Sequence, residues 1–258
     1  MAPRSVFNAT ISFGLINVPI KLFTATDNHT ISFREIHQSD GARLEHRRID
    51  PDTGDTVEYK DIVKGFELSE GEYVEITKDE VKTAAGEKTK SIPIEEFVPA
   101  ADMDPVYFAK TYYLGAREGG EDGYKALKQA LEQTGRAAIG RMTFHDREYL
   151  VAIRALDGVL ALHTMRFADE VVDTGDLELS RPDKAPADRE VKMAGSLVEA
   201  LAADFTPESY EDTYRQRVLE MVHAKAKGEQ VVRPQEDAPA ESSDLFAALE
   251  ASVKGMKK

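Results

Sequence analysis

The sequence predicts a mixed α+β fold, mainly β, in which a β-barrel-like core is followed by C-terminal helices. Three observations support this prediction. Near the N-terminus, apolar and polar side chains alternate with a period of two, as in half-buried strands. Asp157-Gly158 lies between two apolar runs and predicts a hairpin with a type I′ turn. After Ala168 the apolar spacing becomes i, i+3, i+4, i+7, which is typical of amphipathic helices.

The N-terminal region predicts three strands. Phe7 to Phe13 alternates apolar and polar residues, and Gly14 ends this strand. A second strand covers Val18 to Phe23, where Pro19 favours an edge or a bulge because proline cannot donate to a strand ladder. A third strand is predicted at Ile31 to His37.

The polar, arginine-bearing segment 37–65 predicts an extended hairpin or arm with little core of its own. The turn signals Asp40-Gly41 and Asp52-Thr53-Gly54 lie within it. Further along, the pattern Thr77-x-x-Glu80 matches a capping box and predicts a short helix from Lys78 to Ala84.

The middle of the chain predicts helices and strands in turn. Asp104-Pro105 offers an N-cap followed by proline, which predicts a helix from Val106 to Thr111. An apolar face with helical spacing lies between Gly123 and Gly135, and Gly135 is placed as the C-terminal stop. Strands are predicted at Arg141 to Thr143 and at Tyr149 to Ala155.

The C-terminal region predicts amphipathic helices at 190–205 and 208–227, the second closed by Gly228. The stretch 230–243 is rich in Pro, Glu and Ala, a composition typical of linkers, and a short amphipathic helix follows at 245–253. The predicted organisation is a core at 1–228, a flexible linker at 229–243, and a C-terminal helix with a short basic tail at 244–258.

The 258-residue chain has a formal net charge of −14, which taken alone argues against nucleic-acid binding. The acidic residues are concentrated in two blocks. Residues 51–105 hold 15 acidic and 6 basic side chains, and residues 169–212 hold 13 acidic and 4 basic ones. A locally basic surface on a protein with an acidic exterior is therefore compatible with this composition.

The sequence shows no recognisable active site. It has no cysteine and no glycine-rich phosphate loop, and its six histidines lack zinc-binding spacing. We predict that the protein is not an enzyme and uses no catalytic residue, metal or cofactor. An alternative is a metal-dependent nuclease that uses Asp146 and Glu148, although this cluster fits a polar turn between two strands better. His163 is interpreted as a hydrogen-bonded structural histidine.

No apolar run reaches the roughly 18 residues that a membrane-spanning helix requires. The N-terminus also lacks the basic patch and continuous apolar block of a secretory signal. We therefore expect a cytoplasmic protein.

Basic residues gather in two places. Arg136 and Arg141 flank the small or apolar stretch 137–140, where a phosphate could approach closely. The alternative for all these residues is an ordinary solvated surface. The basic residues in or beside the predicted arm are Arg43, His46, Arg47, Arg48, Lys60 and Lys64.

Several segments, in order across residues 5–228, resemble the bacterial Ku family. Residues 11–23, ISFGLINVPIKLF, resemble the opening block of that family. One departure is Phe7-Asn8-Ala9, where many members carry Trp-Lys-Gly; Phe can fill the same apolar position. The other similar segments are 33–37 with Gly54, 61–67, 104–108, 112–114, 134–139 and 167–171.

The resemblance implies a Ku-type β-barrel core with extended arms, in which two copies form a ring around duplex DNA. The implied function is sequence-independent binding of double-stranded DNA ends in non-homologous end joining. The protein would protect the ends, and would recruit and stimulate the ATP-dependent DNA ligase D. Because only the lining of a ring must be basic, a negative net charge does not oppose this function. The expected location is the cytoplasm, at the nucleoid when bound to DNA.

The resemblance also implies where partners bind. Dimerisation is expected through the arms and the helices at 190–205 and 208–227, unless these helices cover their own barrel. A competing interpretation is an acidic protein–protein adaptor without direct DNA binding. The expected ligase-binding residues, unless they form a frayed tail, are Leu245, Phe246, Leu249 and Val253. The expected DNA-binding residues are Lys21, Arg34, Arg43, Arg47, Arg48, Lys60, Lys64, Arg136 and Arg141.

Overall fold

A computed structural model describes residues 4–84, 90–144, 147–179 and 185–229. The chain forms two compact units. The first comprises residues 1–29 and 33–176, and the second comprises residues 30–32 and 177–258. The predicted linker at 229–243, apart from its first residue, and the predicted C-terminal helix lie outside the described residues.

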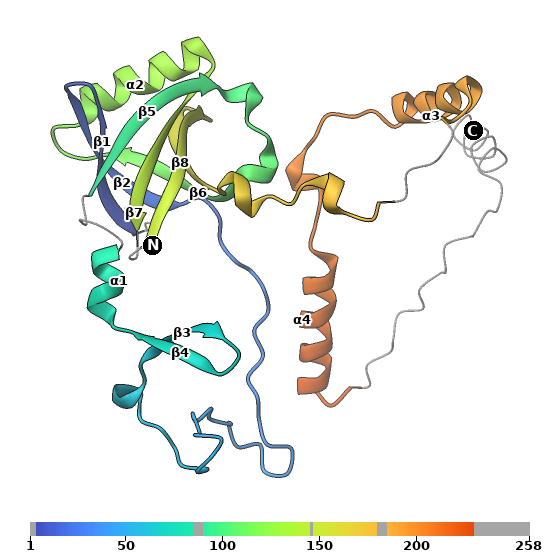
Figure 1. Cartoon of the computed structure of the whole chain (residues 1–258). Helices are drawn as coiled ribbons and strands as arrows, with labels where there is room; N and C mark the ends of the chain where they lie inside the picture. The colour runs from blue at the N-terminus through green and yellow to red at the C-terminus, as the bar shows by residue number, and fades with distance from the viewer. Residues whose placement is uncertain (1–3, 85–89, 145–146, 180–184, 230–258) are drawn as a thin grey trace. The chain divides into compact units, whose positions relative to one another are not determined.

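Seven strands of the first unit close into a barrel in the order β1-β2-β6-β9-β8-β7-β5 (Figure 1). Neighbouring strands are antiparallel except β1 and β5, which pair in parallel. The predicted β-barrel core is therefore confirmed. The strands are β1 (Phe7–Phe13), β2 (Ile16–Thr24), β5 (Ser91–Pro99), β6 (Phe108–Ala116), β7 (Arg136–Phe144), β8 (Arg147–Leu156) and β9 (Val159–Met165).

Alternating side chains of these strands fill the barrel, because successive residues of a strand point to opposite faces. Val18, Ile20 and Leu22 of β2 are fully buried, as are Val151 and Ile153 of β8. These residues belong to one continuous apolar core. The small barrel is therefore packed with side chains.

Helix α2 (Glu121–Thr134) lies across one end of the barrel (Figure 1). Its Leu127 and Leu131 are buried in the barrel core. The Tyr124 hydroxyl donates to the Leu114 carbonyl at 2.7 Å and accepts from the Leu160 amide at 2.9 Å. The helix is thus fixed to strands β6 and β9 by hydrogen bonds as well as by apolar contact.

Several local predictions are confirmed by backbone geometry. The Asp157-Gly158 turn has φ of 48° and 79°, as a type I′ turn requires. Gly135 ends α2 in the left-handed conformation at φ 62°. Helix α1 spans Lys78–Ala84, and the Glu80 carboxylate accepts from the Thr77 amide at 2.8 Å. The hydrogen bonds that Glu80 accepts from Thr77 lower the pKa of Glu80.

The strand predicted at Ile31 to His37 is wrong. This segment forms no ladder and makes one isolated bridge, between Ile36 and Arg43. Ile36 is 60% exposed, so its alternating pattern does not mark a buried face. An alternating sequence becomes a strand only where a neighbouring strand accepts its hydrogen bonds.

The helix predicted at Val106 to Thr111 is also wrong. Asp104 does act as an N-cap, since its carboxylate accepts from the Val106 amide at 2.8 Å. The helical segment lasts only for the 3₁₀ turn Pro105–Tyr107, after which β6 begins. Pairing of β6 with both β2 and β9 overrides the local helix signal.

The edge expected at Pro19 is wrong for β2 as a whole, because this strand has neighbours on both sides. The ladder with β6 starts only at Ile20, so Pro19 lies beyond the end of that pairing. Its carbonyl still accepts from the Arg117 amide at 2.9 Å. The proline is tolerated because the ladder with β6 does not reach it.

The second unit contains α3 (Asp188–Ala200) and α4 (Thr213–Ala226). Both are shorter than predicted, since α3 ends before the expected residue 205. Helix α4 begins later because the Asp212 side chain caps it, accepting from the Arg215 amide at 2.9 Å.

Substituting Gly140 tests the packing of β7 against β5. A Cβ atom at this position would overlap the carbonyl oxygen of Pro93, a backbone atom that cannot turn aside. We expect Gly140→Ala to lower the free energy of unfolding by roughly 1–3 kcal/mol, as overpacking does. Chemical denaturation followed by circular dichroism measures this decrease.

The control is Gly195→Ala in α3, where an added Cβ would meet no atom within 4 Å. This change should be neutral, or should stabilise the helix by up to about 1 kcal/mol. Equal stability of Gly140→Ala and the wild type would contradict this close packing of β7 on β5.

Candidate nucleic-acid interface

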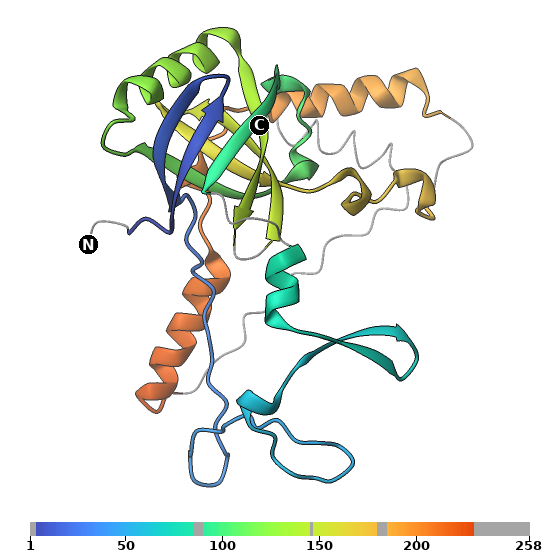
Figure 2. The same cartoon turned by 60° about the vertical axis from the view of Figure 1, so that its left-hand side comes forward.

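A long arm is inserted between β2 and β5, from residue 25 to residue 90 (Figure 1). Two short bridged loops come first, closed by pairing of Ile36 with Arg43 and of Ile49 with Thr56. The 3₁₀ turn Tyr59–Asp61 follows. The arm then contains the hairpin of β3 (Lys64–Ser69) and β4 (Glu72–Ile76), and ends with α1 (Figure 2).

Aspartates shape both loops of the arm. The Asp40 carboxylate accepts from the Ala42 amide at 3.0 Å, and the Asp50 carboxylate accepts from the Asp52 amide at 2.9 Å. Short side chains of this kind hydrogen-bond to nearby backbone groups and so favour turns. Part of the negative charge of the arm therefore has a structural use.

The arm arginines remain exposed and available. Among the described residues, no carboxylate lies within ion-pairing distance of Arg34, Arg43, Arg47 or Arg48. Arg48 lies over the ring of Tyr59, 5.3 Å from its centroid, which leaves the guanidinium charge in place. Four arginines within residues 34–48 thus present positive charge to solvent.

The other basic residues expected to bind DNA differ in whether an ion pair already engages their charge. Lys60 is paired with Glu58 at 2.7 Å. Lys64 is exposed on β3 and Lys21 is exposed on β2. The Arg136 guanidinium donates to the Phe97 carbonyl at 3.0 Å and keeps its charge unpaired among the described residues.

Arg141 is held between two carboxylates. Its Nε lies 3.0 Å from Glu95 and its Nη1 lies 2.8 Å from Glu148. These hydrogen bonds raise the pKa of Arg141, that of Glu148 being the larger cause. The three side chains connect β5, β7 and β8, so the charge of Arg141 is already matched within the protein.

The structure does not bring Arg136 and Arg141 together as a pair. On β7, Ala138 and Met142 point into the core. Arg136 shares their side of the strand, whereas Arg141 lies on the opposite side. A single phosphate therefore cannot be held by both guanidinium groups.

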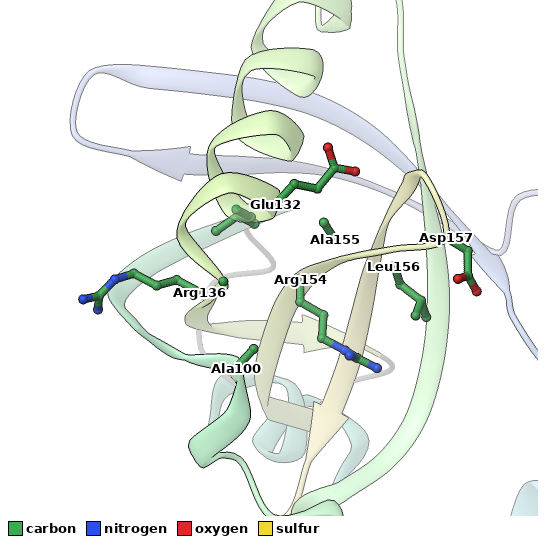
Figure 3. Close-up of a pocket in the computed structure, with 9 residues that line it drawn as sticks. Ala100, Glu132, Arg136, Arg154, Ala155, Leu156 and Asp157 are labelled. Carbon is green, nitrogen blue, oxygen red and sulfur yellow. The ribbon is translucent and has the colours of Figure 1, made fainter. Parts of the chain in front are cut away.

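A cavity of about 300 Å³ lies where α2 leads into β7. In Figure 3 the side chains of Arg136 and Arg154 extend in opposite directions from it. Glu132, which also lines the cavity, is paired with Lys128 at 3.1 Å. The cavity therefore does not bring the guanidinium groups of Arg136 and Arg154 together around one ligand.

Arg154 is a residue that the sequence interpretation missed. Its Nε donates to His163 Nε2 at 3.0 Å, and His163 Nδ1 lies 2.9 Å from the Thr111 hydroxyl. His163 is only 4% exposed, which confirms it as a hydrogen-bonded structural histidine. A detectable signal existed, since Arg154 is the one charged residue in the apolar run 150–156.

The surroundings of His163 keep its imidazole neutral. Burial and the positive charge of Arg154 lower the pKa of His163 to about 4. An imidazole that accepts a hydrogen bond at Nε2 must carry its proton on Nδ1, which then donates to Thr111.

The nuclease alternative finds little support in the described part of the chain. Asp146 lies outside the described residues. Glu148 is bound to Arg141 at 2.8 Å. No group of three His, Asp or Glu side chains suited to a metal ion occurs among the residues that the structure describes. Within the same residues, none of the helices has the length and apolar character needed to cross a membrane.

The fold and the site together define a barrel-and-arm protein, in which a closed β-barrel carries a long arm with exposed arginines between two of its strands. The sequence model of the Ku70/Ku80 beta-barrel domain matches residues 12–193. The chain belongs to the Ku family.

Curated relatives match nearly the whole chain. "Non-homologous end joining protein Ku" of Mycobacterium tuberculosis strain H37Rv is 36% identical over 265 residues, which covers 99% of this chain and 96% of the relative. "Non-homologous end joining protein Ku 1" of Saccharopolyspora erythraea is 40% identical, covering 96% of this chain and 76% of the relative. The Ku protein of Frankia casuarinae is 38% identical, covering 97% and 63% respectively.

Acidification tests the Arg154–His163 interaction. The folded pKa of about 4 is below the unfolded value of 6.5, so only the unfolded chain binds a proton between these values. Stability from the neutral His163 is complete above pH 6.5 and is lost as the pH falls towards 4. From pH 7 to pH 4.5 we expect the wild type to lose about 2 kcal/mol more than His163→Gln.

Urea denaturation at several pH values measures this difference. The exposed His223 of α4 provides the matched control, because His223→Gln removes an imidazole that is not buried. Parallel pH profiles for the wild type and His163→Gln would contradict the interpretation.

Proposed function

We propose that this protein binds the ends of double-stranded DNA without regard to sequence, as a ring-shaped homodimer, in non-homologous end joining. The observation that carries the proposal is the set of exposed arm arginines on a chain of the Ku family. The names of the relatives assign those proteins to non-homologous end joining. Contacts from arginine to the phosphate backbone carry no sequence information, which agrees with binding to any end.

The proposed DNA contacts with the most support are those of the arm. Arg34, Arg43, Arg47 and Arg48 have no ion-pair partner among the described residues, so a phosphate would not have to displace one. Lys21, Lys64 and Arg136 remain proposed contacts of the second rank. Lys60 and Arg141 already face carboxylates, so a phosphate would compete with Glu58 for the first and with Glu95 and Glu148 for the second.

A second copy of the chain is the proposed cover for the arm. In the hairpin of β3 and β4, Phe66 pairs with Val74, and these residues are 63% and 43% exposed. Leu68, where the register of β3 shifts between Glu67 and Ser69, is 63% exposed. An isolated two-stranded hairpin is marginally stable in water, so this apolar face favours a partner surface.

Further roles are proposed from the family resemblance. The protein would protect the ends, and would recruit and stimulate the ATP-dependent DNA ligase D. The proposed ligase-binding residues Leu245, Phe246, Leu249 and Val253 lie outside the described residues. The proposed location is the cytoplasm, at the nucleoid when the protein is bound to DNA.

A comparison of linear and circular DNA tests the proposed function. A ring can thread onto a free end but not onto a closed circle. We expect gel-shift titrations to show binding to a linear duplex and little binding to the same duplex closed into a circle. Equal binding to both forms would contradict threading, and no binding to either would favour the acidic-adaptor interpretation.

The same assay with arm variants locates the DNA-binding residues. The triple variant Arg43→Gln, Arg47→Gln, Arg48→Gln should weaken binding to the linear duplex and flatten its salt dependence. The slope of log Kd against log salt should change by about 0.9 for each phosphate that the variant no longer neutralises. Lys128→Gln is the control, since Lys128 is paired with Glu132 and is not among the proposed DNA contacts. An unchanged slope in the triple variant would place the DNA-binding surface elsewhere.

Dimerisation through the arm gives a separate prediction. The double variant Phe66→Ser, Leu68→Ser removes two large apolar side chains from the hairpin, so we expect analytical ultracentrifugation to show a shift from dimer to monomer. Val198→Ser in α3 is the comparison, because Val198 is also exposed, at 68%. A shift in the α3 variant alone would assign the dimer interface to the helices.

A further inference from the structure

Arg154 is a partly buried cation without a partner of opposite charge. It lies on β8 at intermediate exposure, and no carboxylate of the described residues lies within ion-pairing distance of it. Two other arginines of strands β7 and β8 do have carboxylate partners. Arg141 faces two carboxylates, and Arg147 faces Glu170 at 3.3 Å. Partial burial of an unmatched charge is costly, which favours an anion from outside the chain.

His163 orients Arg154 without neutralising it. The imidazole accepts from Arg154 Nε at 3.0 Å and is fixed on its other side by Thr111 at 2.9 Å. Because the imidazole is neutral, the guanidinium keeps its full charge. The two Nη groups of Arg154 make no hydrogen bond within the described residues, so they remain available as a fork for phosphate oxygens.

Arg154 is partly open to solvent, so a ligand can reach its side chain from outside the barrel. Val151 and Ile153 point into the barrel, so Arg154 belongs to the outer side of β8. Its neighbour across the β8–β9 ladder is Ala161. Arg154 also lines the cavity of about 300 Å³ shown in Figure 3, and its side chain extends away from that cavity.

The other charged side chains that line this cavity do not prevent an anion from binding at Arg154. Glu132 is already paired with Lys128. Asp157 is exposed in the hairpin turn, where solvent screens its carboxylate. Arg136 extends away from Arg154 in Figure 3, so the two arginines do not hold the same group.

We propose that Arg154, positioned by His163, forms a phosphate-binding site on the outer side of the barrel, separate from the arm. The phosphate comes either from the backbone of duplex DNA or from a free phosphate ion. The first source rests on the proposed function, whereas the second does not.

Two measurements on the full-length protein distinguish these sources. The first is the slope of log Kd against log salt for a linear duplex. If DNA supplies the phosphate, Arg154→Gln should flatten this slope by about 0.9 for each phosphate that Arg154 neutralises in the wild type. The second is the melting temperature of the DNA-free protein as inorganic phosphate replaces chloride at constant ionic strength. If free phosphate binds, the melting temperature should rise more in the wild type than in Arg154→Gln, whose rise reflects only the general stabilising effect of phosphate.

Arg147→Gln is the matched control, with the same change of charge on the same strand β8. Arg147 is paired with Glu170 and is not among the proposed DNA contacts, so its removal should leave both readouts as in the wild type. If Arg154→Gln fails to fold, Arg154→Lys keeps the charge but removes the fork and the Nε donor, and should weaken duplex affinity and the phosphate-induced rise in melting temperature.

The role of His163 has its own readout. His163→Leu removes the acceptor for Arg154 and should reproduce the effect of Arg154→Gln. His163→Gln offers an amide oxygen to Arg154 and should restore most of the wild-type response. Failure of the wild type to bind any duplex would refute the proposed function and leave the phosphate titration to decide this site. Wild-type values for Arg154→Gln in both measurements would overturn the inference.

Discussion

The parallel pairing of β1 with β5 is the interaction on which the rest of the structure depends. Three residue pairs, from Thr10–Ser91 to Ser12–Pro93, close the seven-stranded sheet into a barrel. Closure removes both open edges of that sheet. It also places the end of β2 and the start of β5 at the same end of the barrel, because β2 is antiparallel to β1. The arm therefore leaves and returns at one place, with both of its ends anchored in the barrel.

The charge of this protein is informative only when it is considered together with the contacts that each charged side chain makes. On the arm, Asp40 and Asp50 bind backbone amides, and Glu58 binds Lys60. The arginines between residues 34 and 48 have no such partner among the described residues. Negative side chains thus build the loops while positive ones face solvent, which a count of charges cannot reveal.

The sequence correctly predicted the turns and helix ends that depend only on neighbouring residues. The turn at Asp157-Gly158, the capping box at Thr77 and the stop at Gly135 depend on a few adjacent residues, and all three are confirmed. The errors arose where distant strands decide. Phe108–Ala116 carries a helix-start signal but is paired on both sides, and the segment 31–37 alternates but has no neighbouring strand.

The nine expected DNA-binding residues stay a prediction, and the structure shows how exposed and how free of ion pairs each of them is. All nine expected basic residues are exposed. Whether a basic side chain is free depends on carboxylates far along the chain, as the ion pair of Arg141 with Glu95 shows. Arg154 was missed because its importance lies in its hydrogen bond to His163, on the neighbouring strand β9.

The anchoring of both arm ends in the barrel has a mechanical consequence. A ligand that pulls on the arm draws β2 and β5 along their own lengths, towards the end at which they leave the barrel. Loaded in this way, the hydrogen bonds of β2 with β1 and β6 resist together in shear instead of opening one by one as in a zipper. We expect a barrel loaded in shear to hold tension on the arm better than one whose hydrogen bonds open one by one.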